Sequence, residues 1–346
     1  MTRRRVLAAM SGGVDSSVAA ALLIDQGHEV VGVTLKLWGG MSDSGCCSVA
    51  DVEDARRVAQ QLGIVHWVLN FADEFESAVV APYAHAHAAG RTPNPCIECN
   101  RHFKFGVLLE RARKLGFDAV ATGHHARVAP EPSGGYRLLR GADRAKDQSY
   151  VLHMLSQGQL SRCLFPVGEL TKADVRAMAS ELGLRTAEKP ESQDVCFITA
   201  SAGRKAFLGP RIPLRAGTVV DSDGATLGQV DAVELVTVGQ RRGLGLAGGG
   251  EKRYAISVDT AAATVTAGPL EDLMTDQVSV GEMSWVGTPL DAPAEVEVQC
   301  SAHGAPVPAR YEGRAVQFAE PHRRVAPGQS VVLYRGDNVI GGAPAI

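Results

Sequence analysis

The sequence predicts an α/β fold in which a doubly wound parallel sheet is followed by two small β-rich modules, the last of them a β-barrel. Strand-like and helix-like runs alternate over the first two hundred residues, which is typical of a parallel sheet with helices on both faces. From about Gly203 onward Gly, Pro, Val and Thr dominate, and short alternating runs replace the helices. With 346 residues the chain exceeds one typical core. We therefore expect three domains, at residues 1–202, 203–270 and 271–346.

Strands are expected where short apolar or β-branched runs occur, at residues 6–10, 29–35, 65–69 and 119–122. Helices are expected where apolar side chains recur at helical spacing, at residues 18–23, 49–62, 74–89, 105–115, 150–155 and 172–182. Thr171 is a suitable N-cap for the last of these helices. In the β-rich part, alternating runs predict strands at 217–220 and 294–298. Because ligands of doubly wound sheets bind beyond the carboxyl ends of the strands, the segments after the first, second and fourth strands should meet at one pocket.

The segment between the first strand and the first helix, residues 11–16 with the sequence SGGVDS, is the most informative part of the chain. A glycine-rich turn that opens a helix presents unpaired backbone N–H groups to an anion. Gly12 and Gly13 permit the turn and a close approach to phosphate. Asp15 is suited to hold a magnesium ion against phosphate oxygens. No lysine follows at the Walker position, which excludes a Walker loop.

Composition and charge exclude several classes of protein. A net charge of −3, with 45% hydrophobic and 21% charged residues, describes a globular protein that is not basic over its whole surface. Charge is uneven, since residues 91–114 carry six Lys or Arg against two Glu. No stretch approaches the roughly 18 apolar residues of a membrane span, and the basic start leads directly into the glycine loop. Seven cysteines, an odd count, are typical of reduced thiols. We expect a cytoplasmic protein with no membrane partner.

The segment 92–100, with the sequence TPNPCIECN, places two cysteines at a predicted helix start. Asn94 can cap a helix whose first position is Pro95, which puts Cys96 in the first turn. A helix N-terminus lowers the pKa of a thiol, and the positive charge of the following residues lowers it further. A single C-x-x-C nevertheless leaves a redox pair, a zinc half-site and structural thiols all open.

The remaining cysteines and the adjacent histidines do not by themselves indicate a functional site. Cys196 is flanked by apolar residues, which is typical of a buried core thiol. His124 and His125 are adjacent and should point apart on a strand, so that a zinc site is not expected. The cysteines interpreted as packing thiols are Cys46, Cys47, Cys163 and Cys300.

Eight ordered motifs together carry a family resemblance. They are SGGVDS at 11–16, GRTPNPCIECN at 90–100, FKFG at 103–106, ATGHHAR at 121–127, LLRGADRAKDQSYVL at 138–152, LFPVGELTKADVR at 164–176, ESQDVCFI at 191–198 and TVGQRRGLG at 237–245. The sequence closely resembles the tRNA-specific 2-thiouridylases, PP-loop ATP pyrophosphatases with an adenine nucleotide α-hydrolase-like domain. The resemblance implies ATP-dependent 2-thiolation of the wobble uridine in tRNA: the uracil C2 oxygen is adenylylated, pyrophosphate is released, and persulfide sulfur then replaces AMP. It implies ATP and Mg as cofactors, and tRNA and a persulfide donor (a cysteine desulfurase or a sulfur-relay protein) as partners.

The resemblance also implies roles for individual residues. It implies an ATP site made of Ala8, Ala9, Met10, Ser11, Gly12, Gly13, Val14, Asp15, Ser16, Leu35 and Gly123. Two cysteines are implied to be catalytic: Cys196, which carries the persulfide, and Cys99, which can form a disulfide with it during turnover. The residues implied to contact tRNA or its target base are Asn94, Pro95, Cys96, His124, Lys146, Asp147, Gln148, Arg310, Tyr311 and Gln329.

One position departs from the family pattern. Where that pattern often has an aspartate, this chain has Cys96, which cannot act as a proton donor or acceptor at the same pKa. Either a neighbour such as Asp147 takes over the proton transfer, or Cys96 joins the sulfur chemistry. Cys96, Cys99 and Cys196 could also hold an iron–sulfur cluster with three thiolate ligands and one open iron.

Four other functions fit part of the sequence. A PP-loop ligase or amidotransferase-linked synthetase would keep residues 11–16, which we call the phosphate loop. It needs neither paired cysteines nor a tRNA-binding tail. A thiolase of another tRNA base would usually carry further RNA-binding modules at its N-terminus. A non-catalytic RNA-binding protein would hold ATP without releasing pyrophosphate. A C-x-x-C redox protein would not depend on the phosphate loop.

Overall fold

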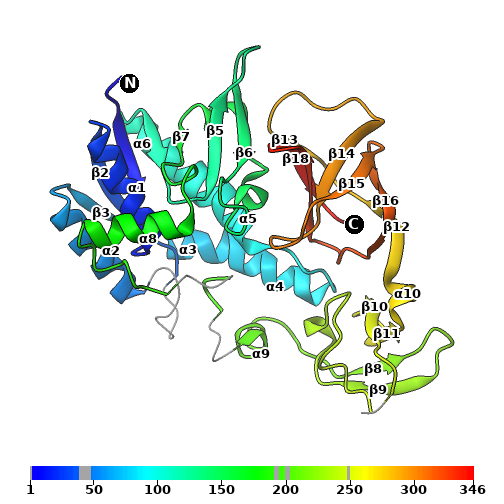
Figure 1. The fold of residues 1–346 in the computed structure, drawn as a ribbon. Coiled ribbons are helices and arrows are strands. Elements are labelled where there is room, and N and C mark those ends of the chain that lie inside the picture. The colour runs from blue at the N-terminus through cyan, green and yellow to red at the C-terminus, as the bar shows by residue number, and fades with distance from the viewer. Residues whose placement is uncertain (1, 39–47, 191–194, 199–202, 248–249) are drawn as a thin grey trace.

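The computed structural model describes residues 2–38, 48–190, 195–198, 203–247 and 250–346. A parallel sheet, a small central module and a large antiparallel sheet follow one another along the chain (Figure 1). Cys46 and Cys47 lie outside the described residues. Within the described ranges, no helix is both long enough and apolar enough to cross a membrane.

The parallel sheet has the strand order β3-β2-β1-β4-β7, and every neighbouring pair is parallel. Its strands are β1 (Arg5–Ala9), β2 (Glu29–Lys36), β3 (His66–Asn70), β4 (Ala119–Ala121) and β7 (Cys163–Leu164). Alternate side chains of β1 enter different cores: Leu7 joins one buried cluster, and Val6 and Ala8 join the other. The helices that line the second cluster are α1 (Val14–Asp25), α2 (Val49–Gln61) and α8 (Lys172–Glu181). The predicted doubly wound sheet is confirmed.

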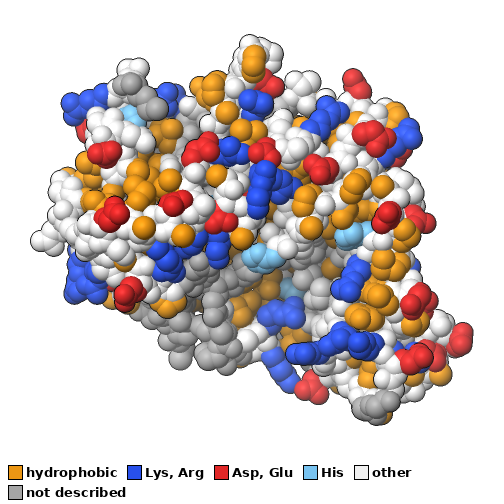
Figure 2. All heavy atoms as spheres, in the orientation of Figure 1, with side chains coloured by type: hydrophobic (Ala, Val, Ile, Leu, Met, Phe, Trp, Pro, Cys, Tyr) orange, Lys and Arg blue, Asp and Glu red, His pale blue; other side chains and the backbone are white. Residues whose placement is uncertain are grey.

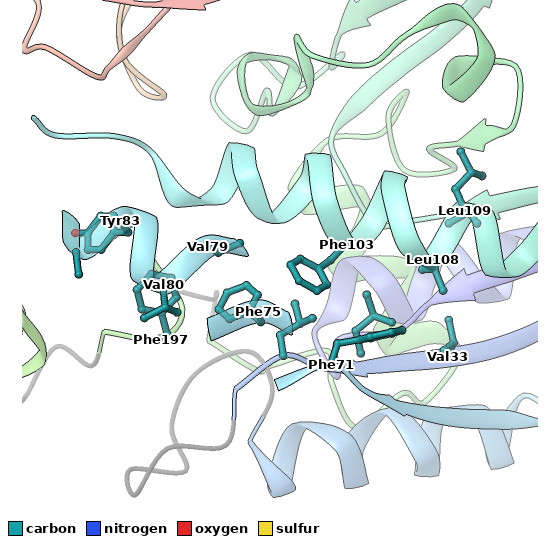
Figure 3. Close-up of a cluster of buried hydrophobic side chains, with 14 of the residues drawn as sticks. Val33, Phe71, Phe75, Val79, Val80, Tyr83, Phe103, Leu108, Leu109 and Phe197 are labelled. Atoms are coloured by element: carbon teal, nitrogen blue, oxygen red, sulfur yellow. The ribbon is translucent and has the colours of Figure 1, made fainter. Parts of the chain in front are cut away.

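The face of the parallel sheet opposite α1, α2 and α8 is covered by helices that contain wider π turns. One helical run comprises α3 (Ala72–Phe75), η1 (Glu76–Val80) and α4 (Ala81–Ala88), and the next comprises α5 (Pro95–Cys99), η2 (Asn100–Val107) and α6 (Leu108–Lys114). Their aromatic rings form a cluster (Figure 3), in which the ring centroids of Phe75 and Phe103 are 5.4 Å apart. The second run is longer than predicted because it begins at the predicted cap: Asn94 Oδ1 accepts a hydrogen bond from the Cys96 N–H at 3.0 Å.

The helix expected over 150–155 does not form, so this prediction is wrong. Only a 3₁₀ turn, η3 (Ser149–Leu152), is present. The carboxylate of Asp147 accepts hydrogen bonds from both the N–H and the hydroxyl of Ser149, each at 3.0 Å, which holds the chain in a turn. The apolar side chains of this run, which helical spacing placed on one helix face, are instead buried in the core shared with the antiparallel sheet.

The β-rich part divides into two sheets. The central module is the four-stranded sheet β10-β11-β8-β9, made of β8 (Gly217–Val220), β9 (Thr226–Val230), β10 (Tyr254–Asp259) and β11 (Thr264–Gly268). The barrel comprises β12 (Met274–Ser279), β13 (Ser284–Trp285), β14 (Ala294–Gln299), β15 (Val307–Tyr311), β16 (Ala315–Arg323), β17 (Ser330–Arg335) and β18 (Asn338–Pro344). The sequence analysis predicted two β-rich modules, the second of them a barrel, and this prediction is confirmed.

A hairpin that the sequence analysis missed connects the N-terminal region to the barrel. β5 (Ala126–Pro130) and β6 (Tyr136–Arg140) pair with each other, and β6 pairs antiparallel with β18. Arg127 strengthens this junction, because its Nη2 donates to Asp337 Oδ2 at 2.7 Å. The barrel sheet therefore extends into the same part of the chain that carries the phosphate loop.

The junction between α4 and the central module contains a buried histidine that makes the fold sensitive to acid. His87 is 2% exposed, and its Nδ1 lies 3.3 Å from the carbonyl oxygen of Glu234 in η4 (Val233–Leu235). Burial lowers the pKa of His87 from 6.5 to about 4. Between these values the unfolded chain binds a proton that the folded chain does not. The stability is therefore present above the unfolded pKa and is lost as pH falls toward 4, by about 3 kcal/mol.

We expect the variant His87→Asn, whose amide N–H replaces the Nδ1–H, to lose less stability on acidification than the wild type. The difference in Tm between the two proteins should shift in favour of the variant as pH falls from 7 to 4.5. Other buried histidines are common to both proteins and cancel in the comparison. Thermal melts at the two pH values measure the effect, and a Tm difference independent of pH would contradict it.

Candidate active site

A cavity of about 320 Å³ lies where the order of the parallel strands reverses, beyond the carboxyl ends of β1 and β4. It brings together most of the residues singled out in the sequence: Ala9, Met10, Ser11, Gly13, Val14, Asp15, Ser16, Leu35, Pro95, Cys96, Cys99, Gly123, His124, Lys146, Gln148 and Cys196. The predicted residues outside this lining are Ala8, Gly12, Asn94, Asp147, Arg310, Tyr311 and Gln329. Segments separated by almost two hundred residues therefore share one cavity.

The phosphate loop opens α1 without a capping side chain. Gly13 is the N-cap of this helix, and no side chain accepts from its first N–H groups. The hydroxyls of Ser16 and Ser17 both donate to the Gly13 carbonyl, at 3.0 and 2.9 Å, which fixes the turn. The open N–H groups and the positive end of the helix dipole therefore face the cavity and suit an anion.

Two glycines are required by close approaches around this loop. Gly12 has a φ of +75°, and a Cβ there would lie 2.3 Å from the Asp51 carbonyl oxygen. A Cβ on Gly123 would lie 2.6 Å from the Ser16 backbone nitrogen. The end of β4 thus packs directly on the first turn of α1, which leaves room for a ligand but not for a larger residue.

Asp15 is the one carboxylate that lines the described cavity, and two basic groups hold it. Lys172 Nζ donates to its Oδ1 and Oδ2 at 2.6 and 2.7 Å, and His125 Nε2 lies 3.3 Å from Oδ1. Burial by itself would raise the pKa of Asp15, but the hydrogen bonds from His125 and Lys172 and the charge of Lys172 outweigh it and lower this pKa. Asp15 is therefore ionised at neutral pH.

The cysteines implied to be catalytic enter the cavity from two different segments. Cys96 and Cys99 stand three residues apart on α5, so that both lie on one helix face. Cys196 lies between Val195, whose φ is +56°, and Phe197, which is 3% exposed. Phe197 packs in the aromatic cluster of Figure 3, with its ring centroid 5.7 Å from that of Phe75. The apolar neighbours that suggested a buried core thiol therefore anchor Cys196 at the wall of the cavity.

No group of three or more His, Cys, Asp or Glu side chains in the described part of the chain is placed to hold a metal ion. Cys96, Cys99 and Cys196, which were suggested as ligands of an iron–sulfur cluster, are therefore not grouped as metal ligands in the described part of the chain. His124 and His125 do point to different partners, as predicted: His124 Nδ1 lies 2.6 Å from Thr122 Oγ1, whereas His125 faces Asp15.

His124 is a neutral part of the cavity wall. Its ring packs between Phe105 and Phe165, with centroid distances of 5.8 Å to each. Burial, followed by the nearby charges of Lys104 and His125, lowers the pKa of His124 well below 6.5. The imidazole is therefore uncharged at neutral pH and is largely shielded from solvent.

The loop with Lys146, Asp147 and Gln148 divides its side chains between two environments. Lys146 and Gln148 line the cavity, and the Gln148 Oε1 accepts from the His125 N–H at 3.0 Å. The Asp147 side chain is 6% exposed and lies outside the cavity lining. Its oxygens accept from Arg140 Nη1 at 2.9 Å and from the N–H groups of Gly141 and Ser149, each at 3.0 Å. The suggestion that Asp147 takes over proton transfer therefore needs correction, because its oxygens are turned into a structural network.

Three residues implied to contact tRNA lie on the barrel. Arg310 is 51% exposed and pairs with Glu312 at 3.0 Å. Tyr311 is 5% exposed, and its ring meets Trp285 edge-on inside the barrel, so that its face is not presented to a nucleobase. Gln329 Nε2 donates to the carbonyl of Thr92, close to the cap of α5. Arg310 is thus the exposed cation of this set.

The sequence analysis missed Lys104, His125 and Lys172 as lining residues. One signal for Lys172 was available. It is the first residue of α8, where the positive end of the helix dipole disfavours a cation. A lysine at that position needs an acidic partner, and Asp15 provides it.

Comparisons with known proteins agree over the whole chain. Three family models match the chain. The model described as "tRNA methyl transferase HUP domain" matches residues 4–200, the one described as "tRNA methyl transferase PRC-barrel domain" matches 205–269, and the one described as "Aminomethyltransferase beta-barrel domain" matches 275–345. A protein named tRNA-specific 2-thiouridylase MnmA from Mycobacteroides abscessus is 49% identical over 98% of this chain and 98% of its own length. Another with that name, from Chloroflexus aurantiacus, is 47% identical over 97% of both chains.

Proposed function

The chain belongs to the tRNA-specific 2-thiouridylase family, and we propose on this basis that both half-reactions take place in the cavity at the strand switch point. The enzyme is an ATP-dependent tRNA-uridine 2-sulfurtransferase that thiolates the wobble uridine. The observation that carries the proposal is the meeting of the phosphate loop, Cys99 and Cys196 in one cavity. The three segments 1–202, 203–270 and 271–346 then serve as catalytic domain, central module and tRNA-binding barrel.

The first half-reaction activates the uracil. The open N–H groups of α1 hold the phosphates of ATP, and Leu35 and Gly123 flank the nucleotide. The uracil C2 oxygen attacks the α-phosphorus, and pyrophosphate leaves with the electrons of the broken P–O bond. Lys146 and Lys172, which both line the cavity, supply positive charge as the phosphate charge develops.

Magnesium fits this arrangement. Asp15 is an ionised residue of the phosphate loop and lines the cavity, and one carboxylate together with nucleotide phosphates is a common set of ligands for Mg²⁺. When bound, the ion would neutralise charge on the departing pyrophosphate. Lys172 and His125 keep the carboxylate in place in its absence.

The second half-reaction inserts sulfur. A persulfide donor, either a cysteine desulfurase or a sulfur-relay protein, loads Cys196. The terminal sulfur of the persulfide attacks C2, and AMP leaves with the C2–O electrons. The Cys99 thiolate then attacks Sγ of Cys196, and the S–S bond breaks toward the uridine sulfur. This leaves 2-thiouridine and a Cys99–Cys196 disulfide, which an external dithiol reduces.

The tRNA must span the barrel and the catalytic domain. Figure 2 shows Lys and Arg side chains gathered beside the central module, and Arg241 and Arg242 of that module are exposed. Arg310 supplies a further exposed cation on the barrel. These charges suit a polyanion whose target base is turned out of the anticodon loop. An odd number of cysteines, which is typical of reduced thiols, and a tRNA substrate support a cytoplasmic location.

The purified protein should release pyrophosphate when mixed with ATP and tRNA that has an unmodified wobble uridine. Because activation precedes sulfur insertion, no sulfur donor is needed for a first turnover. Addition of a persulfide donor should then yield 2-thiouridine, which mass spectrometry of the digested nucleosides detects. Release of no pyrophosphate would favour an RNA-binding protein that merely holds ATP. Sulfur found on another nucleoside would favour a thiolase of a different base.

A further inference from the structure

We propose that the C-terminal barrel forms part of the catalytic apparatus, because Gln299 and Tyr334 of the barrel fix the loop that carries Lys146 and Gln148. The established resemblance treats the barrel as a surface for tRNA. The described contacts connect it instead to the wall of the cavity. The inference rests on the proposed function in one respect, namely that Lys146 and Gln148 face the reacting groups.

The chain of contacts begins at Gln299, the last residue of β14, which is 4% exposed. Its Nε2 donates to the carbonyls of Ser301 and Ala302, at 3.0 and 3.2 Å. These two bonds set the orientation of the amide, so that Oε1 faces the N-terminal region. There Oε1 accepts from Arg140 Nη1 at 2.9 Å. The barrel therefore offers a single oriented acceptor to a buried arginine.

Arg140 connects Gln299 to the loop that carries Lys146, Asp147 and Gln148. The residue is 7% exposed, and its Nη1 also donates to Asp147 Oδ2 at 2.9 Å. Its guanidinium lies over the ring of Tyr334 in β17, 3.6 Å from the centroid. Gln299 and Tyr334 of the barrel thus position the Arg140 guanidinium, which in turn binds Asp147. Losing one partner of a buried ion pair leaves the other charge uncompensated, so the contacts that position Arg140 also matter for Asp147.

Asp147 closes the loop on both sides of Lys146. Its Oδ1 accepts from the N–H groups of Gly141 and Ser149, each at 3.0 Å. The hydroxyl of Ser149 lies 3.3 Å from that of Tyr334, which returns the chain to the barrel. Lys146 and Gln148 flank Asp147 and point into the cavity. Their placement is therefore set by contacts that end on the barrel.

A second contact of the barrel supports the opposite wall. The Thr92 N–H donates to the carbonyl of Pro327 at 2.7 Å, two residues before the Asn94 cap of α5. Gly328 fits against this segment with a φ of +89°, and a Cβ there would lie 3.2 Å from the Pro93 nitrogen. The barrel thus touches the chain next to both Cys96 and Lys146.

Two glutamines allow a matched test. Gln157 also bridges the N-terminal region and the barrel part of the chain, since its Nε2 donates to Tyr136 and Val286 carbonyls at 2.8 and 2.7 Å. Its Oε1 accepts from the Tyr136 N–H at 2.8 Å, so that it makes three hydrogen bonds, as Gln299 does. Gln157 does not line the cavity, and none of its three hydrogen bonds is to Arg140. Replacing Gln157 therefore removes as many hydrogen bonds as replacing Gln299, but leaves the loop with Lys146 and Gln148 in place.

Single-turnover and steady-state thiolation of full-length protein should separate the two variants. We expect Gln299→Leu to lower kcat at saturating tRNA by about tenfold or more, with the KM for tRNA within about twofold of wild type, because misplaced catalytic groups slow the reaction without weakening remote binding. Gln157→Leu should keep the wild-type kcat, with a comparable loss of Tm. Arg310→Ala should show the opposite pattern, a raised KM for tRNA with unchanged kcat.

Equal kcat values for Gln299→Leu and wild type would overturn the inference, as would an equal fall in both glutamine variants. If Gln299→Leu does not fold, Tyr334→Phe removes only the hydroxyl that meets Ser149, and its kcat should still fall while its KM for tRNA does not. Lys146→Met separates the inference from the proposed function. Full activity of that variant would refute the role of Lys146 itself, whereas a slow Lys146→Met beside a fast Gln299→Leu would refute only the role of the barrel.

Discussion

Cys196→Ser is expected to lose thiolation by at least about 10³-fold while its first-turnover release of pyrophosphate stays at the wild-type rate. A serine hydroxyl cannot carry a persulfide, but it fills nearly the same space as a thiol. The neighbouring Phe197 keeps its place in the aromatic cluster, so that the wall of the cavity should not collapse. Nucleoside mass spectrometry and a pyrophosphate assay measure the two half-reactions separately.

Two other cysteine variants sharpen this experiment. In Cys99→Ser the persulfide can still attack C2, but the thiolate assigned to attack Sγ of Cys196 is missing, and a disulfide-linked adduct of enzyme and tRNA should accumulate. Cys300→Ser is the control, because Cys300 lies outside the cavity and burial raises its pKa to about 12. Thiolation by Cys196→Ser at more than a tenth of the wild-type rate would contradict the assigned role of the persulfide. Loss of pyrophosphate release in the same variant would show instead that Cys196 shapes the nucleotide site.

Asp15→Asn should reduce pyrophosphate release by about 10²–10³-fold while the variant still accepts a persulfide on Cys196. The substitution keeps the size of the side chain but removes the charge that Lys172 and His125 compensate. Lys172 then has a neutral neighbour, and Mg²⁺ loses its one protein carboxylate among the described cavity residues. Pyrophosphate assays at saturating ATP, together with mass spectrometry of the loaded protein, measure the two properties.

The control for this prediction lies on the same helix. Asp25 is the last residue of α1 and is exposed, so that Asp25→Asn removes one negative charge far from the cavity. It should release pyrophosphate at the wild-type rate. Normal release by Asp15→Asn would rule out a role of this carboxylate in the nucleotide half-reaction. Loss of persulfide loading would indicate that the phosphate loop and the Cys196 segment cannot be separated in function.

Local chemistry explains which parts of the fold could be predicted. The caps at Asn94 and Thr171 are formed by the residues themselves, and their hydrogen bonds run to N–H groups within three positions. The inner strands β1, β2 and β4 are mainly apolar and buried because both faces of the sheet are covered there. The phosphate loop follows β1 directly, so that its place at the carboxyl end of a strand was readable from the order of the elements.

The errors share one physical cause. The run 150–155 has helical spacing, but Asp147 and the packing of a shared core favour a turn there. The family resemblance implied that Asp147 contacts the target base, but its side chain turns away from the cavity that Lys146 and Gln148 line. Distant contacts contributed to both cases: the run 150–155 is buried against strands of the barrel, and Gln299 of the barrel binds the Arg140 that pairs with Asp147.

By itself the sequence determined the order of strands and helices, the anion-binding turn and the identity of the reactive side chains, because these depend on backbone propensity and on chemistry carried by neighbouring residues. Only the tertiary structure decided which of them meet. It seated Cys196 beside the phosphate loop, paired Lys172 with Asp15, and joined the hairpin of β5 and β6 to the barrel. Such contacts depend on the shape of a packed core, which no short stretch of sequence records.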